Sequence, residues 1–265
     1  SDLTIKLWDL NNDYLCSKTL FGHNHNVSQL AFNNEGDMLL SCSRDKTIKL
    51  SEVATGYCKR TYTGHENWVR RVLLAQDNQT IVSASDDQSV IVWNINKEAP
   101  VLRFFAHDNV IEALLLVEGE HSGKLMGSDF LKHKFTGESK LNALKQLTEK
   151  GSEGLGNYYQ SFLFTGGRDK VIKLFVLQTG EHLHTFFGHD NWVRCLSLHS
   201  SGKYLYSCSD DKSIRIWDLQ SGKEKKKFDA AHDHFISSVK FNPKYGVVAS
   251  GGNDMVLKLW HLRTV

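Results

Sequence analysis

The chain has 265 residues, of which 40% are hydrophobic and 23% charged, as in an ordinary globular protein. This composition excludes a disordered or collagen-like chain. The 32 basic and 30 acidic residues leave a formal charge of only +2, so we expect neither nucleic acid nor an anionic membrane as a partner.

A pair of landmarks repeats along the chain at a spacing of about forty residues. Glycine or alanine followed by histidine recurs five times, at His23, His65, His107, His189 and His232. An aspartate follows 22 residues after each histidine except His107, where the gap is 62 because about forty residues are inserted. Six residues beyond each aspartate lies a position that holds Trp8, Ser51, Trp93, Phe175, Trp217 or Trp260. Such a period with these landmarks is typical of WD-repeat propellers with four-stranded blades.

Alternating apolar and polar residues predict four strands in each repeat and almost no helix. In the first complete repeat the expected strands are 27–32, 38–43, 47–53 and 56–63. The predicted fold class is therefore all-β, a WD-repeat β-propeller.

The repeat also predicts how one propeller domain is divided into blades. Partial blades are expected at 1–22 and 232–265, and complete blades at 23–64, 65–106, 107–188 and 189–231. These ranges hold 21 strands, whereas a seven-bladed ring needs 28, and the missing seven would all precede Ser1. We expect an N-terminally truncated seven-bladed propeller with about five to six blades present; a closed ring of five blades is the alternative.

The inserted residues 118–160 interrupt the blade at 107–188 between its first and second strands. They are rich in Gly, Ser, Lys and Glu, with a short amphipathic stretch at 141–150. We expect a solvated loop; the alternative is a docking element that folds on a partner.

The landmark side chains themselves are predicted to be structural. In a blade, histidine, aspartate, serine and tryptophan form a buried polar chain, and a set that recurs once per repeat is not an active site. The residues assigned to it are His65, Asp87, Trp93, His189, Asp211, Trp217, His232, Asp254 and Trp260. The blades with Ser51 or Phe175 lack the indole donor, so we expect these two to be weaker.

Motifs for catalysis or metal binding are not found in the sequence. No nucleophile elbow, phosphate loop or zinc-protease motif is present, and the five cysteines never form CxxC pairs. His23 and His232 each belong to a closely spaced pair of histidines, but both are already assigned to blades. We therefore expect no enzyme activity, no cofactor and no metal.

Arginine and tryptophan are placed at fixed offsets in the loops at one end of the blades. GHENWVR at 64–70 and GHDNWVR at 188–194 supply Trp68, Arg70, Trp192 and Arg194. Other basic residues flank the landmark aspartates, namely Arg44 and Arg168 before them and Lys46, Lys170 and Lys212 after them. This composition is typical of protein-binding hot spots. The alternative is that both tryptophans only pack between blades.

These motifs, together with SRDKTIK, GGRDKVIK, TGYCKRTYTGH and the long insertion, resemble the lissencephaly-protein family of dynein regulators. That family is also described as the noncatalytic subunit of a brain-type platelet-activating-factor acetylhydrolase. The resemblance covers all 265 residues, with departures at Ser51, Phe175 and His261. It implies a seven-bladed propeller whose narrow face binds the motor domain of cytoplasmic dynein, preceded by a LisH segment and coiled coil that make a homodimer. The implied motor-contacting residues are Arg44, Arg70, Arg168, Trp192 and Lys212.

The resemblance predicts a noncatalytic scaffold that binds the cytoplasmic dynein heavy chain and regulates its microtubule attachment and motility. Further implied partners are dynein-associated coiled-coil adaptors and acetylhydrolase catalytic subunits. The expected location is the cytoplasm, on microtubules and at centrosomes or basal bodies. Two alternatives are another WD-repeat adaptor, such as a ubiquitin-ligase substrate receptor or ciliary scaffold, and a regulatory subunit of the acetylhydrolase.

Overall fold

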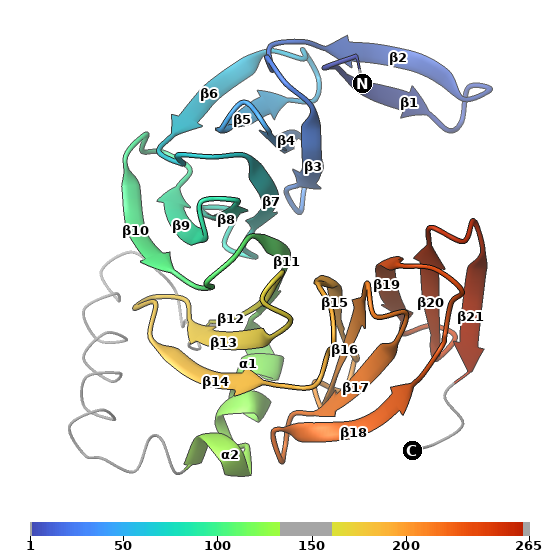
Figure 1. Ribbon diagram of the computed structural model, residues 1–265. Coiled ribbons are helices and arrows are strands. Elements are labelled where there is room, and N and C mark those ends of the chain that lie inside the picture. Colours follow the sequence, from blue (N-terminus) through green and yellow to red (C-terminus); the bar gives the residue numbers. More distant parts are fainter. Residues whose placement is uncertain (1, 133–160, 262–265) are drawn as a thin grey trace. The chain divides into compact units, whose positions relative to one another are not determined.

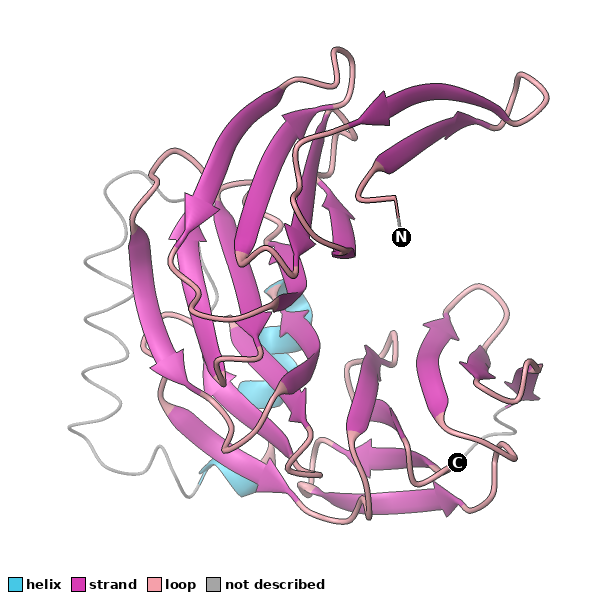
Figure 2. Ribbon diagram, turned by 45° about the horizontal axis from the view of Figure 1, so that its top comes forward, coloured by secondary structure: helices cyan, strands magenta, loops and turns pink. Residues whose placement is uncertain are grey.

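The computed structural model describes residues 2–132 and 161–261, which form two compact units. The first unit is Ser1–Ile111 and the second is Glu112–Val265. Figure 1 labels the strands along the chain, and Figure 2 shows that strands make up nearly all regular structure of the described residues. Within these residues no helix has the length and apolar character needed to cross a membrane.

The first unit contains one two-stranded and two four-stranded antiparallel sheets, each made of strands that are consecutive in sequence. The strands of the two-stranded sheet are β1 (Ile5–Asp9) and β2 (Leu15–Leu20). One four-stranded sheet consists of β3 (Val27–Phe32), β4 (Met38–Ser43), β5 (Thr47–Glu52) and β6 (Cys58–Thr63). The other consists of β7 (Val69–Leu74), β8 (Thr80–Ser85), β9 (Ser89–Asn94) and β10 (Pro100–Phe105).

The second unit contains two four-stranded sheets and one three-stranded sheet. Its first sheet is made of β11 (Ile111–Val117), β12 (Phe162–Gly167), β13 (Ile172–Val176) and β14 (His182–Phe186). The next contains β15 (Val193–Leu198), β16 (Tyr204–Ser209), β17 (Ile214–Asp218) and β18 (Lys223–Phe228). The last contains β19 (Ile236–Asn242), β20 (Val247–Gly252) and β21 (Leu257–His261).

The prediction of an all-β fold built from four-stranded blades is confirmed. In the blade β3–β6 the first two strands have the predicted ends. The fourth begins two residues later than predicted, because Gly56, with φ of 77°, closes a turn by donating its amide hydrogen to the Glu52 carbonyl at 2.8 Å.

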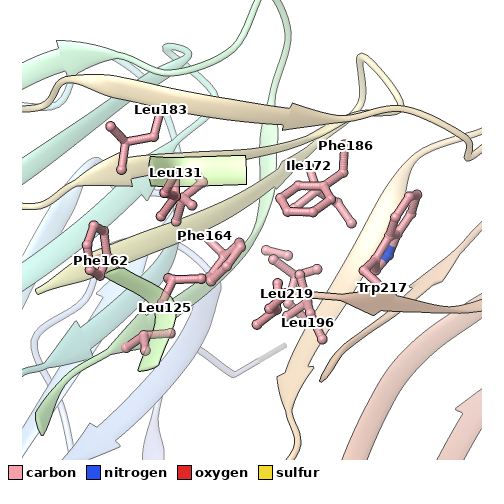
Figure 3. Close-up of a cluster of buried hydrophobic side chains, with 14 of the residues drawn as sticks. Leu125, Leu131, Phe162, Phe164, Ile172, Leu183, Phe186, Leu196, Trp217 and Leu219 are labelled. Carbon is pink, nitrogen blue, oxygen red and sulfur yellow. The ribbon is translucent and has the colours of Figure 1, made fainter. Parts of the chain in front are cut away.

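The inserted segment includes two short helices, α1 (Gly119–Met126) and α2 (Asp129–Lys132). Leu125 and Leu131 from these helices are buried in one cluster with strand residues such as Phe162 and Leu183 (Figure 3). The expectation of a solvated loop is therefore wrong for 119–132, because these leucines complete the core of the second unit. The predicted amphipathic stretch at 141–150 lies outside the described residues.

The two helices also contact turns of the next blade, β15–β18. Lys124 Nζ donates a hydrogen bond to the Ser201 carbonyl at 3.2 Å, and the Asp129 amide donates to the Gln220 carbonyl at 3.0 Å. Phe130 packs against His184, with ring centroids 4.7 Å apart. The segment thus holds two consecutive blades of the second unit together.

Candidate protein-binding site

The turn between the second and third strands of a blade fixes the landmark aspartate. In β3–β6 the turn closes when the Lys46 amide donates to the Ser43 carbonyl at 3.3 Å. Asp45 accepts hydrogen bonds from the Thr47 hydroxyl at 2.6 Å and from the Asn24 amide at 2.9 Å. The aspartate therefore ties this turn to the loop that carries the landmark histidine.

A buried polar chain continues from the aspartate through histidine to serine. Because an ionised carboxylate only accepts, His65 Nδ1 donates to Asp87 at 2.9 Å, and its Nε2 accepts from the Ser83 hydroxyl at 2.8 Å. The Trp93 indole N–H then donates to the same Ser83 oxygen at 2.8 Å. Complete chains of this kind also contain His189, Asp211, Ser207 and Trp217, and His232, Asp254, Ser250 and Trp260.

In the blade β3–β6, burial and hydrogen bonding favour a charged Asp45 and a neutral His23. Burial alone would raise the pKa of Asp45, but hydrogen bonds from Thr47, the Asn24 amide and His23 together lower it to about 2. Burial lowers the pKa of His23 and outweighs the attraction of Asp45. We interpret the chains as structural, because their polar atoms are bonded to one another inside the blades.

The blade β3–β6 keeps part of this chain without a tryptophan. His23 Nδ1 lies 2.8 Å from Asp45, and its Nε2 lies 2.8 Å from the Ser41 hydroxyl. Ser51, at the tryptophan position, is buried with 6% of its surface exposed. In the blade β11–β14 the equivalent Phe175 packs edge-on against His182 at 5.4 Å. The lower stability expected of these two blades stays a prediction.

In four blades the first strand has a register shift near its start, which turns one side chain out of the sheet. It occurs at the second residue of β3, β7, β15 and β19, which is Ser28, Arg70, Arg194 and Ser237 respectively. Such a β-bulge leaves the residue unpaired and re-aims its side chain. All four lie five residues after the landmark histidine, the offset at which β11 carries Glu112.

Both bulge arginines are held by an aspartate of their own blade. Arg70 donates from Nε and Nη2 to the two oxygens of Asp86, at 2.6 and 2.9 Å. Arg194 makes the same bidentate pair with Asp210, at 2.8 and 2.7 Å. This hydrogen bonding raises the pKa of Arg194, against the opposing effect of burial. Both guanidinium groups are consequently fixed in direction.

Each fixed arginine lies over a tryptophan ring together with a second arginine, and we call each such group of three residues a stack. In the first stack, the guanidinium carbons of Arg44 and Arg70 lie 4.7 and 5.2 Å from the Trp68 ring centroid. In the second stack, those of Arg168 and Arg194 lie 4.0 and 4.8 Å from the Trp192 ring centroid. These are cation–π distances.

Each stack combines residues of two consecutive blades. The outer arginine precedes the landmark aspartate of one blade, and the tryptophan and bulge arginine belong to the next. The Trp68 carbonyl accepts from the Asp86 amide at 2.9 Å, and the Trp192 carbonyl accepts from the Asp210 amide at 3.0 Å. The tryptophans therefore do lie between blades, and both rings also remain partly exposed.

Comparison with known proteins identifies the repeat. The family model described as WD domain, G-beta repeat matches residues 14–50, 56–94, 180–218 and 222–261. The chain belongs to the WD-repeat family. The longest unmatched stretch is 95–179, which holds β10 to β13 and the insertion.

The WD-repeat chain is similar over most of its length to fungal nuclear distribution proteins. It is 36% identical to nudF of Aspergillus niger over 244 residues, which are 92% of this chain and 51% of that protein. It is 39% identical to PAC1 of Arthroderma otae over 254 residues, again 92% and 51%. The chain thus spans about half the length of these relatives. The resemblance to the lissencephaly-protein family is confirmed.

The structure distributes the predicted partner-binding residues of this WD-repeat protein over both units. Arg44 and Arg70 lie in the first stack, and Arg168 and Trp192 lie in the second. Lys212 lies in the β16–β17 turn, in the same blade as Trp192. It is exposed and has a left-handed backbone, with φ of 67°.

Sequence reasoning missed the acidic residues that hold the stacks, namely Asp86, Asp210 and Glu112. A signal for the first two is the doubled aspartate in SDDQ and SDDK, at the place where SRDK and GRDK have Arg–Asp. The signal for Glu112 is an acid at the offset that elsewhere carries arginine or serine. The residues that the structure describes contain no cluster of three His, Cys, Asp or Glu side chains that could hold a metal ion.

Proposed function

We propose that this chain is a noncatalytic scaffold that binds the motor domain of cytoplasmic dynein and regulates its attachment to microtubules. The observation that carries the proposal is the pair of Arg–Trp–Arg stacks. Two of the relatives are named nuclear distribution proteins, which supports a role in the dynein pathway.

The stacks have the chemistry of a protein-binding surface. Tryptophan and arginine are the residue types that most often dominate interface energy. Arg70 and Arg194 are already fixed by bidentate pairs, so less side-chain entropy is lost when a partner binds. Lys212 adds an exposed cation to the blade that also carries Trp192. A partner surface with carboxylates and an apolar recess would complement these groups.

The test is titration of purified dynein motor domain against the wild-type chain and the triple variant Arg44→Ala/Arg168→Ala/Lys212→Ala. Because charge-assisted contacts at hot spots are strong, we expect the variant to lose at least about 2 kcal/mol, or roughly thirtyfold in Kd. Raising the salt concentration should weaken the wild-type complex more steeply than that of the variant, since screening acts on the removed charges.

A matched control removes three cations elsewhere. Lys223, Lys225 and Lys226 are exposed on β18, the edge strand of its sheet. Replacing all three by alanine changes the net charge equally and should leave the Kd within about twofold. All three proteins should first be shown to unfold at similar temperatures. Equal affinities in the three titrations would contradict the proposal and favour another WD-repeat adaptor.

A further inference from the structure

The second stack contains an acidic residue that the first lacks. Glu112 is buried, with 4% of its surface exposed, and its Oε1 accepts from Arg168 Nε at 2.7 Å. The same oxygen lies 2.6 Å from Arg168 Nη2 and 3.3 Å from Arg194 Nη1. One carboxylate therefore bridges the two guanidinium groups that lie over the Trp192 ring.

The first stack has a serine at the matching position. Ser28 lies five residues after its landmark histidine, as Glu112 does, and its hydroxyl is buried without a hydrogen-bond partner. Arg44, the counterpart of Arg168, makes no ion pair with any residue in 2–132 or 161–261. Arg44 is nevertheless held in place by the Trp68 ring.

The two stacks therefore differ in whether the outer arginine has a carboxylate partner. In the first stack Arg70 pairs with the Asp86 carboxylate, whereas Arg44 makes no ion pair with a described residue. In the second, Arg168 and Arg194 are matched by the anions Glu112 and Asp210. Two stacks of similar geometry can thus make two different kinds of contact with a partner.

We propose that Glu112 is a positioning residue that neutralises the second stack, so that only the first, through Arg44, takes a partner carboxylate, while the second presents Trp192 as a rigid apolar contact. The identity of the partner rests on the proposed function. The charge assignment does not, because it concerns residues of this chain alone.

The hydrogen-bonding capacity of the arginines supports this division. Arg168 already pairs with Glu112 through Nε and Nη2, so the carboxylate of a partner would have to displace a buried ion pair. The guanidinium of Arg44 has no such ion pair, so its planar group can form a bidentate pair with the carboxylate of a partner. Lys212, at the exposed position after Asp211, is a separate cation outside the second stack.

Arginine reactivity tests the charge assignment without any partner. Phenylglyoxal modifies accessible guanidinium groups, and peptide mass spectrometry gives a rate for each arginine. In the wild-type chain we expect Arg44 to react faster than Arg168. Because a neutral acceptor binds a guanidinium more weakly than a carboxylate, Glu112→Gln should speed the reaction of Arg168 at least about threefold. Arg70, which is held by Asp86, serves as the internal control.

The reverse substitution keeps the proposal testable if Glu112→Gln does not fold. Ser28→Glu supplies the first stack with the missing carboxylate and should slow the reaction of Arg44 to the rate of Arg168. An unchanged rate at Arg168 in Glu112→Gln, or at Arg44 in Ser28→Glu, in a variant with a wild-type melting temperature would overturn the assignment.

Titrations with the dynein motor domain at two ionic strengths test the consequence for binding. Ser28→Glu should weaken binding roughly tenfold and flatten its dependence on salt, because a charge pair with the partner is lost. Glu112→Gln should make the dependence on salt steeper, because Arg168 becomes available. The opposite order of salt dependence would overturn the proposal. If the wild-type chain does not bind the motor domain, the proposed function is wrong, and the modification rates still decide the charge assignment.

Discussion

The blades β3–β6 and β7–β10 of the first unit share a polar chain but differ in whether a tryptophan completes it. The His23–Asp45 and His65–Asp87 pairs have nearly the same length, 2.8 and 2.9 Å. In β7–β10 the buried Trp93 adds an indole donor to this chain. The comparison shows that the hydrogen bonds among aspartate, histidine and serine form without tryptophan. The larger role of the tryptophan is therefore to fill the core of the blade.

The largest effect is expected from Trp93→Ala, which would test this interpretation. Trp93 is 1% exposed, and a Cβ atom on Gly64 would lie only 2.8 Å from its ring. Removing so large a buried ring should lower the free energy of unfolding by about 3–5 kcal/mol. Trp68→Ala is the matched control in the same blade and should cost about 1 kcal/mol or less, because Trp68 is partly exposed. Urea denaturation measures both, and equal losses would show that Trp93 is not a core residue.

A second prediction compares Asp45 and Asp87, which accept matching hydrogen bonds, although Asp87 also lies 3.5 Å from Arg103 Nη2. Each aspartate accepts hydrogen bonds from the landmark histidine and from the amide of the residue that follows this histidine. Each also accepts one from a hydroxyl, of Thr47 or Ser89 respectively. Asp45→Ala and Asp87→Ala should each cost about 1–3 kcal/mol, because buried donors lose their acceptor. Similar losses in urea denaturation would support an independent polar chain; a negligible loss for Asp45 alone would show that the chain needs tryptophan.

A third, smaller difference is expected between the two serines. The Ser83 oxygen receives the Trp93 indole N–H and its hydroxyl bonds His65, whereas Ser41 bonds His23 with no indole present. Ser83→Ala therefore leaves one more buried donor without a partner and should cost about 1 kcal/mol more than Ser41→Ala. Thermal unfolding of the two variants side by side measures the difference. A reversed order would mean that the indole finds another acceptor.

The fourth prediction concerns the dependence of stability on pH. The pKa of Asp45 falls from its ordinary value of 3.8 to about 2, so its contribution to stability is present above pH 3.8 and is lost as the pH falls toward 2. The pKa of His23 lies below its ordinary 6.5, so the unfolded chain takes up this proton first, and acidification below pH 6.5 also destabilises the fold. The free energy of unfolding of Asp45→Asn should therefore change less between pH 4 and pH 2 than that of the wild-type chain. Parallel curves would contradict this role for Asp45.

Much of the fold could be predicted from the sequence, because the landmark spacing fixes which residues face one another. An aspartate 22 residues after a histidine lies on the turn that closes over that histidine, as the His65–Asp87 bond shows. The helices α1 and α2 could not be predicted in this way. The Gly, Ser and Lys content of α1 is typical of a loop, and its helical form depends on tertiary burial of Leu125.

For the candidate site, the arginines and tryptophans could be predicted and their acidic partners were missed. The doubled GHxNWVR motif places Trp68 and Trp192 at equal offsets, and both form stacks. The pairing of Arg168 with Glu112 joins residues 56 positions apart, across the insertion. No short-range spacing reveals such a pair, which depends on the turn before β13 lying beside the start of β11.

The bulge at the start of the first strands also bears on how such a protein diversifies. Because the bulged residue makes no ladder pair, its replacement leaves the neighbouring strand pairs in place. The position five residues after the landmark histidine holds serine, arginine, glutamate, arginine and serine in successive repeats. A duplicated blade can therefore inherit its core intact and acquire a new surface chemistry through one substitution, so that recognition evolves separately from folding.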